Sequence, residues 1–251
     1  MMIRSTDDLV AYSLRLSVET PLSVGAGNLG FMKEVLKAPA FVGGSQVLVP
    51  VIPSSSIKGA LRAVAESLRG SLGDSVLERV AKGHSRIDEF KRMRDVAHEF
   101  DGDLEEIKRL TGESLDVTDE RKREELLRRA CPICRLFGAP GIASRMRLSD
   151  AVPAGAVHLG YMTRVAMDRK RMKVKEKRIF RDEFVLPGAE FRALMILDFR
   201  GCSAALVNGM NAVLDRILRF GEEVGLQLGG GRSIGRGLVK LSVTEIKGAD
   251  S

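Results

Sequence analysis

Residues 228–243 read Leu-Gly-Gly-Gly-Arg-Ser-Ile-Gly-Arg-Gly-Leu-Val-Lys-Leu-Ser-Val. Five glycines within nine residues predict a loop whose backbone can take positive φ and can be approached closely, and the alternation that follows predicts a strand. Arg232 and Arg236 add fixed positive charge with a planar fork that suits phosphate. The loop therefore indicates contact with a polyanion; a glycine-rich connection with solvated arginines is the alternative.

The segments on either side of this loop predict alternating strands and helices. Apolar and polar residues alternate over 12–18 and 191–199, and shorter strands are predicted over 47–52, 146–148 and 157–159. Helices are predicted over 54–68 and 206–218, where apolar side chains recur at helical spacing. Residues 25–44 are expected to be irregular, and strand 191–199 is expected to be buried on both faces near its middle.

The order strand, helix, two or more strands, helix, strand is the βαββαβ pattern of a modified ferredoxin-like fold, an α+β architecture related to RNA recognition motifs. Residues 71–130 are charged and helix-favouring and carry no strand signal, which predicts a helical insertion or lid. Residues 161–190 predict a protruding basic β-hairpin. We expect a single domain over residues 1–251 that contains both features.

Composition favours an acidic partner. The chain has 251 residues, 44% of them hydrophobic, and a formal net charge of +7, so it can bury a substantial core while remaining basic. Residues 161–181 hold nine basic and two acidic residues and thereby account for the whole net charge. No apolar run reaches membrane length and no secretory signal is visible, so we expect a cytoplasmic protein without membrane contact.

The helix predicted after Pro53 begins with three serines. Ser54, Ser55 and Ser56 are candidate caps, while Lys58 and Arg62 lie four residues apart and share a helix face. Such a helix start suits phosphate, whereas ordinary capping beside surface cations is the alternative. The glycine-rich pattern of nucleotide-binding P-loops is absent, which disfavours ATP binding.

Residues 131–134 read Cys-Pro-Ile-Cys, which is half of a zinc site. Cys131 and Cys134 have a spacing that binds Zn²⁺ well, but a closed site needs two more ligands. His84 and His98 belong to the helical insertion and could supply them if the insertion folds back over the cysteines. We therefore expect a structural zinc, with buried reduced thiols or a redox pair as the alternatives.

Signatures of catalysis are missing. No Gly-x-Ser-x-Gly elbow occurs, and none of the three histidines lies in the glycine loops. Aromatic residues make up only 5% of the chain, so base-stacking platforms are not expected either. No catalytic residue is assigned, and any nucleic acid would be bound mainly through its phosphate backbone.

Four ordered motifs resemble the repeat-associated mysterious proteins, the RAMP superfamily, and in particular the backbone subunits of type III CRISPR effector complexes. Residues 52–59 are similar to the family's Ile-Pro-Gly-Ser-Ser-Leu-Lys-Gly segment, and residues 131–151 to its Cys-x-x-Cys-x-Leu-Phe-Gly and Ser-Arg-Leu-x-x-x-Asp-Ala run. Residues 184–191 match the end of the family's thumb hairpin, and residues 228–237 match its C-terminal glycine loop.

The resemblance implies a palm with a lid and a thumb, and copies that assemble head to tail along a guide RNA (crRNA) with other subunits of an antiviral complex. The helix start and the glycine loop would contact guide phosphates, and the thumb would insert into the duplex of guide and complementary target RNA. The RNA-binding residues expected on these grounds are Ser54, Ser55, Ser56, Lys58, Arg62, Arg164, Met167, Arg169, Lys170, Arg171, Met172, Gly229, Gly230, Gly231, Arg232, Ser233, Gly235 and Arg236.

One departure from the family pattern concerns cleavage. In catalytic backbone subunits an aspartate after the first strand supports cleavage of target RNA, whereas residues 25–44 contain no Asp and Lys37 stands about where it would be. The sequence therefore implies guide binding without efficient cleavage. The alternatives are a terminal or capping subunit, a general basic RNA-binding domain, and a guide-processing endoribonuclease of the same superfamily. Such endoribonucleases usually have a histidine in the N-terminal half as general base, and no histidine occurs here before His84.

Overall fold

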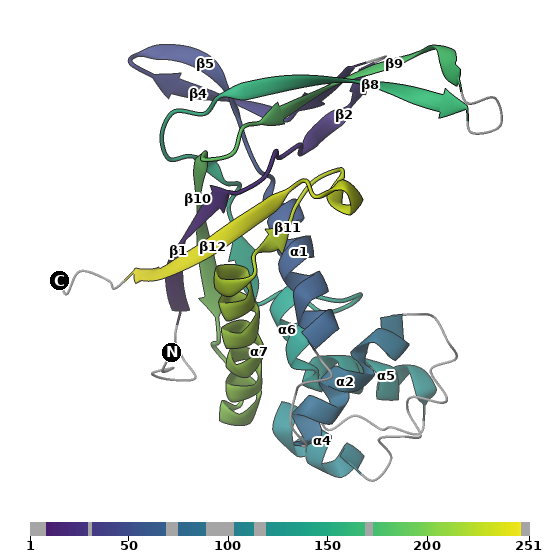
Figure 1. The fold of residues 1–251 in the computed structure, drawn as a ribbon. Helices are drawn as coiled ribbons and strands as arrows, with labels where there is room; N and C mark the ends of the chain where they lie inside the picture. The colour runs from purple at the N-terminus through teal and green to yellow at the C-terminus, as the bar shows by residue number, and fades with distance from the viewer. Residues whose placement is uncertain are drawn as a thin grey trace.

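The computed structural model of the chain describes residues 9–29, 32–68, 75–88, 103–112, 119–168 and 173–246. Its main sheet has the order β11-β12-β1-β10-β6 with antiparallel neighbours, and β7 also pairs with β10 (Figure 1). These strands are β1 (Leu9–Val18), β6 (Met146–Leu148), β7 (Val152–Pro153), β10 (Glu190–Asp198), β11 (Leu226–Gln227) and β12 (Leu238–Ile246). Because α1 (Ser54–Ser67) follows β1 and α7 (Ala204–Glu223) follows β10, the sheet is the predicted ferredoxin-like palm.

Alternation along the strands explains the core of the palm. In β1 every second side chain from Tyr12 to Val18 is buried, as the sequence predicts. In β10 the side chains of Phe191 and Met195 are fully buried, but Leu194 on the other face is 39% exposed. The expectation that both faces of this strand are buried is therefore wrong, because the helices of the palm do not cover the face that carries Leu194.

The two palm helices pack against each other and against the sheet edge formed by β11 and β12. Ser203 caps α7, its hydroxyl accepting a hydrogen bond from the N–H of Leu206. The apolar faces of α1 and α7 are buried, with Leu61 and Leu214 at 0% exposure. Each such side chain stabilises the fold by about 1.5–3 kcal/mol.

Helices fill the part of the region 71–130 that the structure describes. They are α2 (Val76–Asp88), α4 (Leu104–Thr111) and α5 (Glu120–Ala130), followed by the short α6 (Pro132–Phe137). They lie at the end of the molecule opposite the long hairpin, around buried side chains such as Ile107 and Leu126 (Figure 1). Within the described segments, no helix has the length and apolarity that a bilayer crossing requires.

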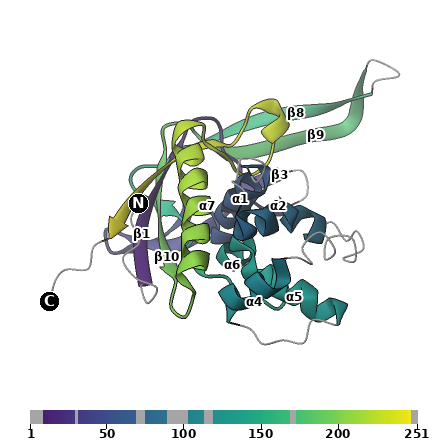
Figure 2. The same ribbon diagram turned by 90° about the horizontal axis from the view of Figure 1, so that it is seen from below.

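A second sheet lies at the opposite end, with the order β2-β3-β9-β8. It comprises β2 (Gly25–Leu29), β3 (Met32–Val35), β8 (Leu159–Asp168) and β9 (Lys173–Val185), and β8 and β9 form the predicted hairpin, which extends away from the palm (Figure 2). A two-stranded ribbon, β4 (Lys37–Val42) and β5 (Ser45–Pro50), completes this end. The expectation that residues 25–44 are irregular is therefore wrong, since pairing with distant β9 and nearby β5 orders them.

Candidate nucleic-acid interface

The glycine loop is fastened to the segment that follows β1. The N–H of Gly237 donates to the carbonyl of Pro21 (3.0 Å), and the N–H of Gly230 donates to the carbonyl of Ser23 (2.9 Å). Gly229 has φ +69°, and a Cβ there would lie 2.3 Å from the Ser23 carbonyl oxygen, so no larger residue fits. Arg232 to Ile234 form a short 3₁₀ turn that projects outward between two glycines of positive φ.

A cationic pocket of about 260 Å³ lies where the glycine loop, the start of β2, β3 and the β8–β9 hairpin meet. Three cationic side chains and one carboxylate face it. Its lining residues are Ser23, Gly25, Lys33, Arg164, Asp182, Gly230, Gly231 and Arg236. Two of the three predicted RNA-binding segments line this pocket: the glycine loop, through Gly230, Gly231 and Arg236, and the hairpin, through Arg164.

Asp182 organises the charges of this pocket. Its carboxylate pairs with Arg164 Nε at 2.9 Å and with Arg236 Nη1 at 3.5 Å. The Arg236 side chain is only 8% exposed and stacks over the Phe184 ring at 5.5 Å, so it braces the hairpin against the glycine loop. Arg164 is 36% exposed and Lys33 is exposed, which leaves these two cations accessible to a ligand.

The start of α1 differs from the prediction. No serine side chain caps the helix; instead the N–H of Ser54 donates to Oδ1 of Asp150 at 2.7 Å. Hydrogen bonds from Ser54 hold the pKa of Asp150 below its usual range. The capping role expected for Ser54, Ser55 and Ser56 is thus wrong, because a carboxylate from a segment 96 residues away occupies the helix terminus.

The two cations of α1 contact the loop that follows α6. Lys58 Nζ donates to Ser144 Oγ (2.6 Å) and to the carbonyl of Met146 (3.0 Å). Arg62 pairs with Glu66 and donates to the carbonyl of Gly138. Burial, and to a lesser degree the Arg62 charge, lowers the pKa of Lys58. An ammonium has three donors, so Lys58 retains one proton for an anion.

The structure brings α1 and the glycine loop close together without merging them into one pocket. Helix α1 contacts β11, the strand that enters the loop, and the two lie side by side in Figure 1. Lys58 and Arg62, however, do not line the cationic pocket. Both side chains contact residues 138–146, which lead into β6 at the opposite edge of the palm sheet from β11, so a single groove shared with the glycine loop stays a prediction.

Sequence reasoning missed Lys33, because residues 25–44 show no alternation that would have placed it on a strand. It also missed a buried acid beside Lys37. Glu183 is 1% exposed and accepts hydrogen bonds from Lys37 Nζ (2.9 Å), Tyr161 Oη (3.0 Å) and the N–H of Val35 (3.0 Å). Burial alone would raise the pKa of Glu183, but these hydrogen bonds outweigh it and lower the pKa.

The predicted tip of the thumb lies outside the described residues. Arg169, Lys170, Arg171 and Met172 are not described, and only the backbone of Met167 is, as part of β8. Their role in RNA binding stays a prediction. Ser233 and Gly235 are exposed on the outer turn of the glycine loop, next to Arg232.

The zinc site also stays a prediction. Cys131 and Cys134 are fully buried at the start of α6, where Cys131 is the N-cap residue. The described part of the chain contains no group of three or more His, Cys, Asp or Glu side chains that could hold a metal ion. The side chain of His84 and the whole of His98 lie outside that part.

Comparison with known proteins agrees with this architecture. The model of the RAMP superfamily matches residues 15–240. No curated protein sequence matches the chain. A chain of a "Type IV-B CRISPR Complex" is similar in structure, with a TM-score of 0.54 and 22% identity over 95% of this chain and 93% of that chain.

A second solved structure has the same fold. A chain in "Cryo-EM structure of the Type III-B Cmr-beta bound to cognate target RNA" has a TM-score of 0.50 and 16% identity. The alignment covers 96% of this chain but 62% of that chain. Because the family match spans most of the sequence and both structures share the ferredoxin-like palm, the chain belongs to the RAMP superfamily.

Proposed function

We propose that the protein is a guide-RNA-binding backbone subunit of a CRISPR effector complex of the type III kind, and that copies of it assemble along the guide with other subunits. The observation that carries this proposal is the cationic pocket between the glycine loop and the base of the hairpin, with Lys33 and Arg164 accessible in it. In this proposal Lys58 and Arg62 of α1 contact the same RNA outside the pocket.

The chemistry of the pocket suits a sugar-phosphate backbone better than bases. Its accessible groups are cationic side chains, and Gly230 and Gly231 have no side chains that would keep a phosphate away from them. Such contacts carry no base information, as a subunit that must accept any guide sequence requires. Electron micrographs of the protein mixed with guide RNA test the backbone role: a helical filament supports it, and isolated particles contradict it in favour of a terminal subunit.

Removing accessible cations is expected to weaken RNA binding equally for all sequences. Lys33→Ala and Lys58→Ala should each raise the dissociation constant for single-stranded RNA by about tenfold, since hydrogen bonds to charged groups contribute about 1.5–3 kcal/mol. Each should also reduce the slope of log K against log salt by about 0.7. Fluorescence anisotropy with RNAs of unrelated sequence at several salt concentrations measures both quantities.

Lys240→Ala is the matched control for these variants, because Lys240 is an exposed lysine on β12 outside the pocket and outside α1. Its affinity should stay within about twofold of the wild type, as is usual for surface substitutions away from a site. Loss of binding to one RNA sequence only, or equal loss in all three variants, would contradict the proposed interface.

We further propose that the subunit does not cleave target RNA efficiently. Lys37, the first residue of β4, stands about where the family resemblance places a catalytic aspartate, and Glu183, the buried acid that it contacts, accepts three hydrogen bonds. A carboxylate with a lowered pKa and its oxygens already engaged is a poor general base. Complementary RNA incubated with the assembled complex and Mg²⁺ should remain intact; cuts at regular intervals that disappear on mutation of this subunit would refute this.

A further inference from the structure

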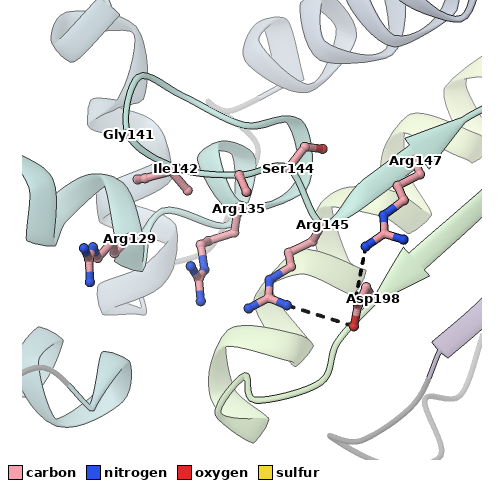
Figure 3. A pocket seen from close by; sticks show the side chains of 9 residues that line it. Arg129, Arg135, Gly141, Ile142, Ser144, Arg145, Arg147 and Asp198 are labelled. Atoms are coloured by element: carbon pink, nitrogen blue, oxygen red, sulfur yellow. Dashed lines mark ion pairs between the residues drawn. The ribbon is translucent and has the colours of Figure 1, made fainter.

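A second pocket, of about 360 Å³, gathers arginines from three separate elements (Figure 3). Arg129 comes from the end of α5 and Arg135 from α6. Arg145 immediately precedes β6, and Arg147 is the middle residue of that strand. The loop 141–144 closes one side, and Asp198 at the end of β10 closes the other. This pocket shares no lining residue with the pocket of the glycine loop.

The carboxylate of Asp198 contacts three arginines: Arg145 and Arg147 of the lining, and Arg200 outside it. Arg200 holds both oxygens of Asp198, with Nε at 2.9 Å and Nη2 at 2.8 Å. Arg147 and Arg145 then reach the same carboxylate only at 3.6 Å and 4.0 Å. Hydrogen bonds from Arg200, with a smaller contribution from the charge of Arg145, hold the pKa of Asp198 well below its usual range, so the carboxylate is ionised. One negative charge then faces three guanidinium groups.

Arg135 lies between these side chains with little to bind (Figure 3). Its Nε is buried and has no hydrogen-bond partner among the described residues, and its Nη2 reaches only the Cys202 sulfur at 3.9 Å. Arg129, on the far wall, pairs with Glu125. The lining therefore holds four arginines and one carboxylate, Asp198, which leaves a surplus of positive charge in a concave space.

We propose that this pocket binds a phosphate group. A gathering of guanidinium groups is repulsive on its own and becomes favourable when an oxyanion lies between them, since each planar fork can donate two parallel hydrogen bonds. A phosphomonoester carries about −1.5 to −2 charge at pH 7 and matches the surplus better than a single carboxylate does. The volume lies in the range of ligand pockets, about 300–1,000 Å³, so a nucleoside attached to the phosphate fits as well.

The phosphate can come from two sources, the terminal phosphate of an RNA strand or an internal phosphodiester. Ser144 separates the pocket from the cations of α1: its hydroxyl accepts the Lys58 hydrogen bond, and in Figure 3 its side chain turns away from the arginines. The two pockets share no lining residue, so substitutions of Arg135 and Arg147 test phosphate binding here without altering Lys33, Arg164 or Lys58 of the proposed guide interface.

Calorimetric titration with inorganic phosphate at constant ionic strength tests the pocket. Arg147→Gln is the main variant, because this side chain is 67% exposed and its loss should not disturb folding. Arg135→Gln is the second, and Arg192→Gln, an exposed arginine six residues before Asp198 on β10, is the matched control. Both pocket variants should weaken phosphate binding by at least about tenfold and the control by less than about twofold.

Two short RNAs of one sequence, with a 5′-phosphate or a 5′-hydroxyl, identify the source. A dependence on Arg147 only for the phosphorylated RNA supports a terminal phosphate, and equal dependence for both supports an internal one. The proposal is overturned if Arg147→Gln and Arg135→Gln bind phosphate as the wild type does while circular dichroism shows all proteins folded. It is also overturned if these variants alter only self-association, since the pocket would then take a carboxylate from a neighbouring copy.

Discussion

Gly237→Ala is expected to lower the free energy of unfolding by at least about 4 kcal/mol, a loss seen only when a substitution violates a specific structural requirement. Gly237 has φ +77°, and a Cβ there would lie 1.9 Å from the carbonyl oxygen of Leu228. That backbone cannot simply move aside, because the N–H of Leu228 donates to the carbonyl of Gly237 across the neck of the loop (2.8 Å). Urea denaturation followed by circular dichroism measures the loss.

Gly235→Ala is the control that separates the effect of close packing around the added Cβ from the effect of positive φ. Gly235 has nearly the same φ, +79°, but a Cβ there would have nothing within 4 Å. This variant should lose only about 1–2 kcal/mol, the cost of the left-handed conformation for a residue with a Cβ. If both variants lower the free energy of unfolding equally, close packing at the neck of the loop is not the reason that position 237 requires glycine.

Glu183→Gln is expected to cost about 1–3 kcal/mol, the usual effect of removing a buried hydrogen-bond partner, because the Lys37 side chain that it leaves behind is 27% exposed. The variant leaves the charge of Lys37 beside a neutral amide. The amide NH₂ group of the glutamine would also face donors, since Lys37, Tyr161 and the N–H of Val35 all donate to Glu183. Because Glu183 belongs to β9 and its partners to β8, β3 and β4, the base of the hairpin should loosen. Thermal unfolding and hydrogen exchange of the hairpin amides measure the two effects.

Glu190→Gln is the matched control, since Glu190 is 44% exposed and pairs with Arg15 only at 3.7 Å. It should cost no more than about 1 kcal/mol.

The pH dependence of stability provides a second check of the Glu183 contacts. The folded pKa of Glu183 is lowered, so its stabilisation is fully present above the ordinary glutamate pKa of about 4.3 and is lost as pH falls through the folded value. The difference in free energy of unfolding between the wild type and Glu183→Gln should therefore shrink below about pH 4. A difference that does not change with pH would contradict a stabilising role for the Glu183 carboxylate.

Local patterns in the sequence predicted the palm. The alternation in β1, the apolar face of α7 and the glycines of the loop each depend on residues within a few positions of one another, and all three are confirmed. The sequence predicted that the start of α1 and the glycine loop share one groove, whereas the pocket beside the glycine loop is completed by the base of the hairpin and not by Lys58 or Arg62.

Contacts between distant residues account for what the sequence could not predict. Lys33 faces the pocket because β3 pairs with β9, and no pattern in residues 25–44 predicts that pairing. Asp150 replaces the expected serine caps from 96 positions away, and Glu183 meets Lys37 across 146. Arg236 was expected at the surface, but the hairpin that covers it comes from a different part of the chain.

Pairing between β1 and β12 has a consequence for biosynthesis. Val18 and Val239 are partners although they lie more than 200 residues apart, and the glycine loop joins the segment after β1 only once β12 is in place. During translation, β1 therefore lacks its partner on this edge until residues 238–246 have been synthesised. The glycine loop cannot join Pro21 and Ser23 before that point, so the RNA binding proposed for this loop requires that β12 has been made and has paired.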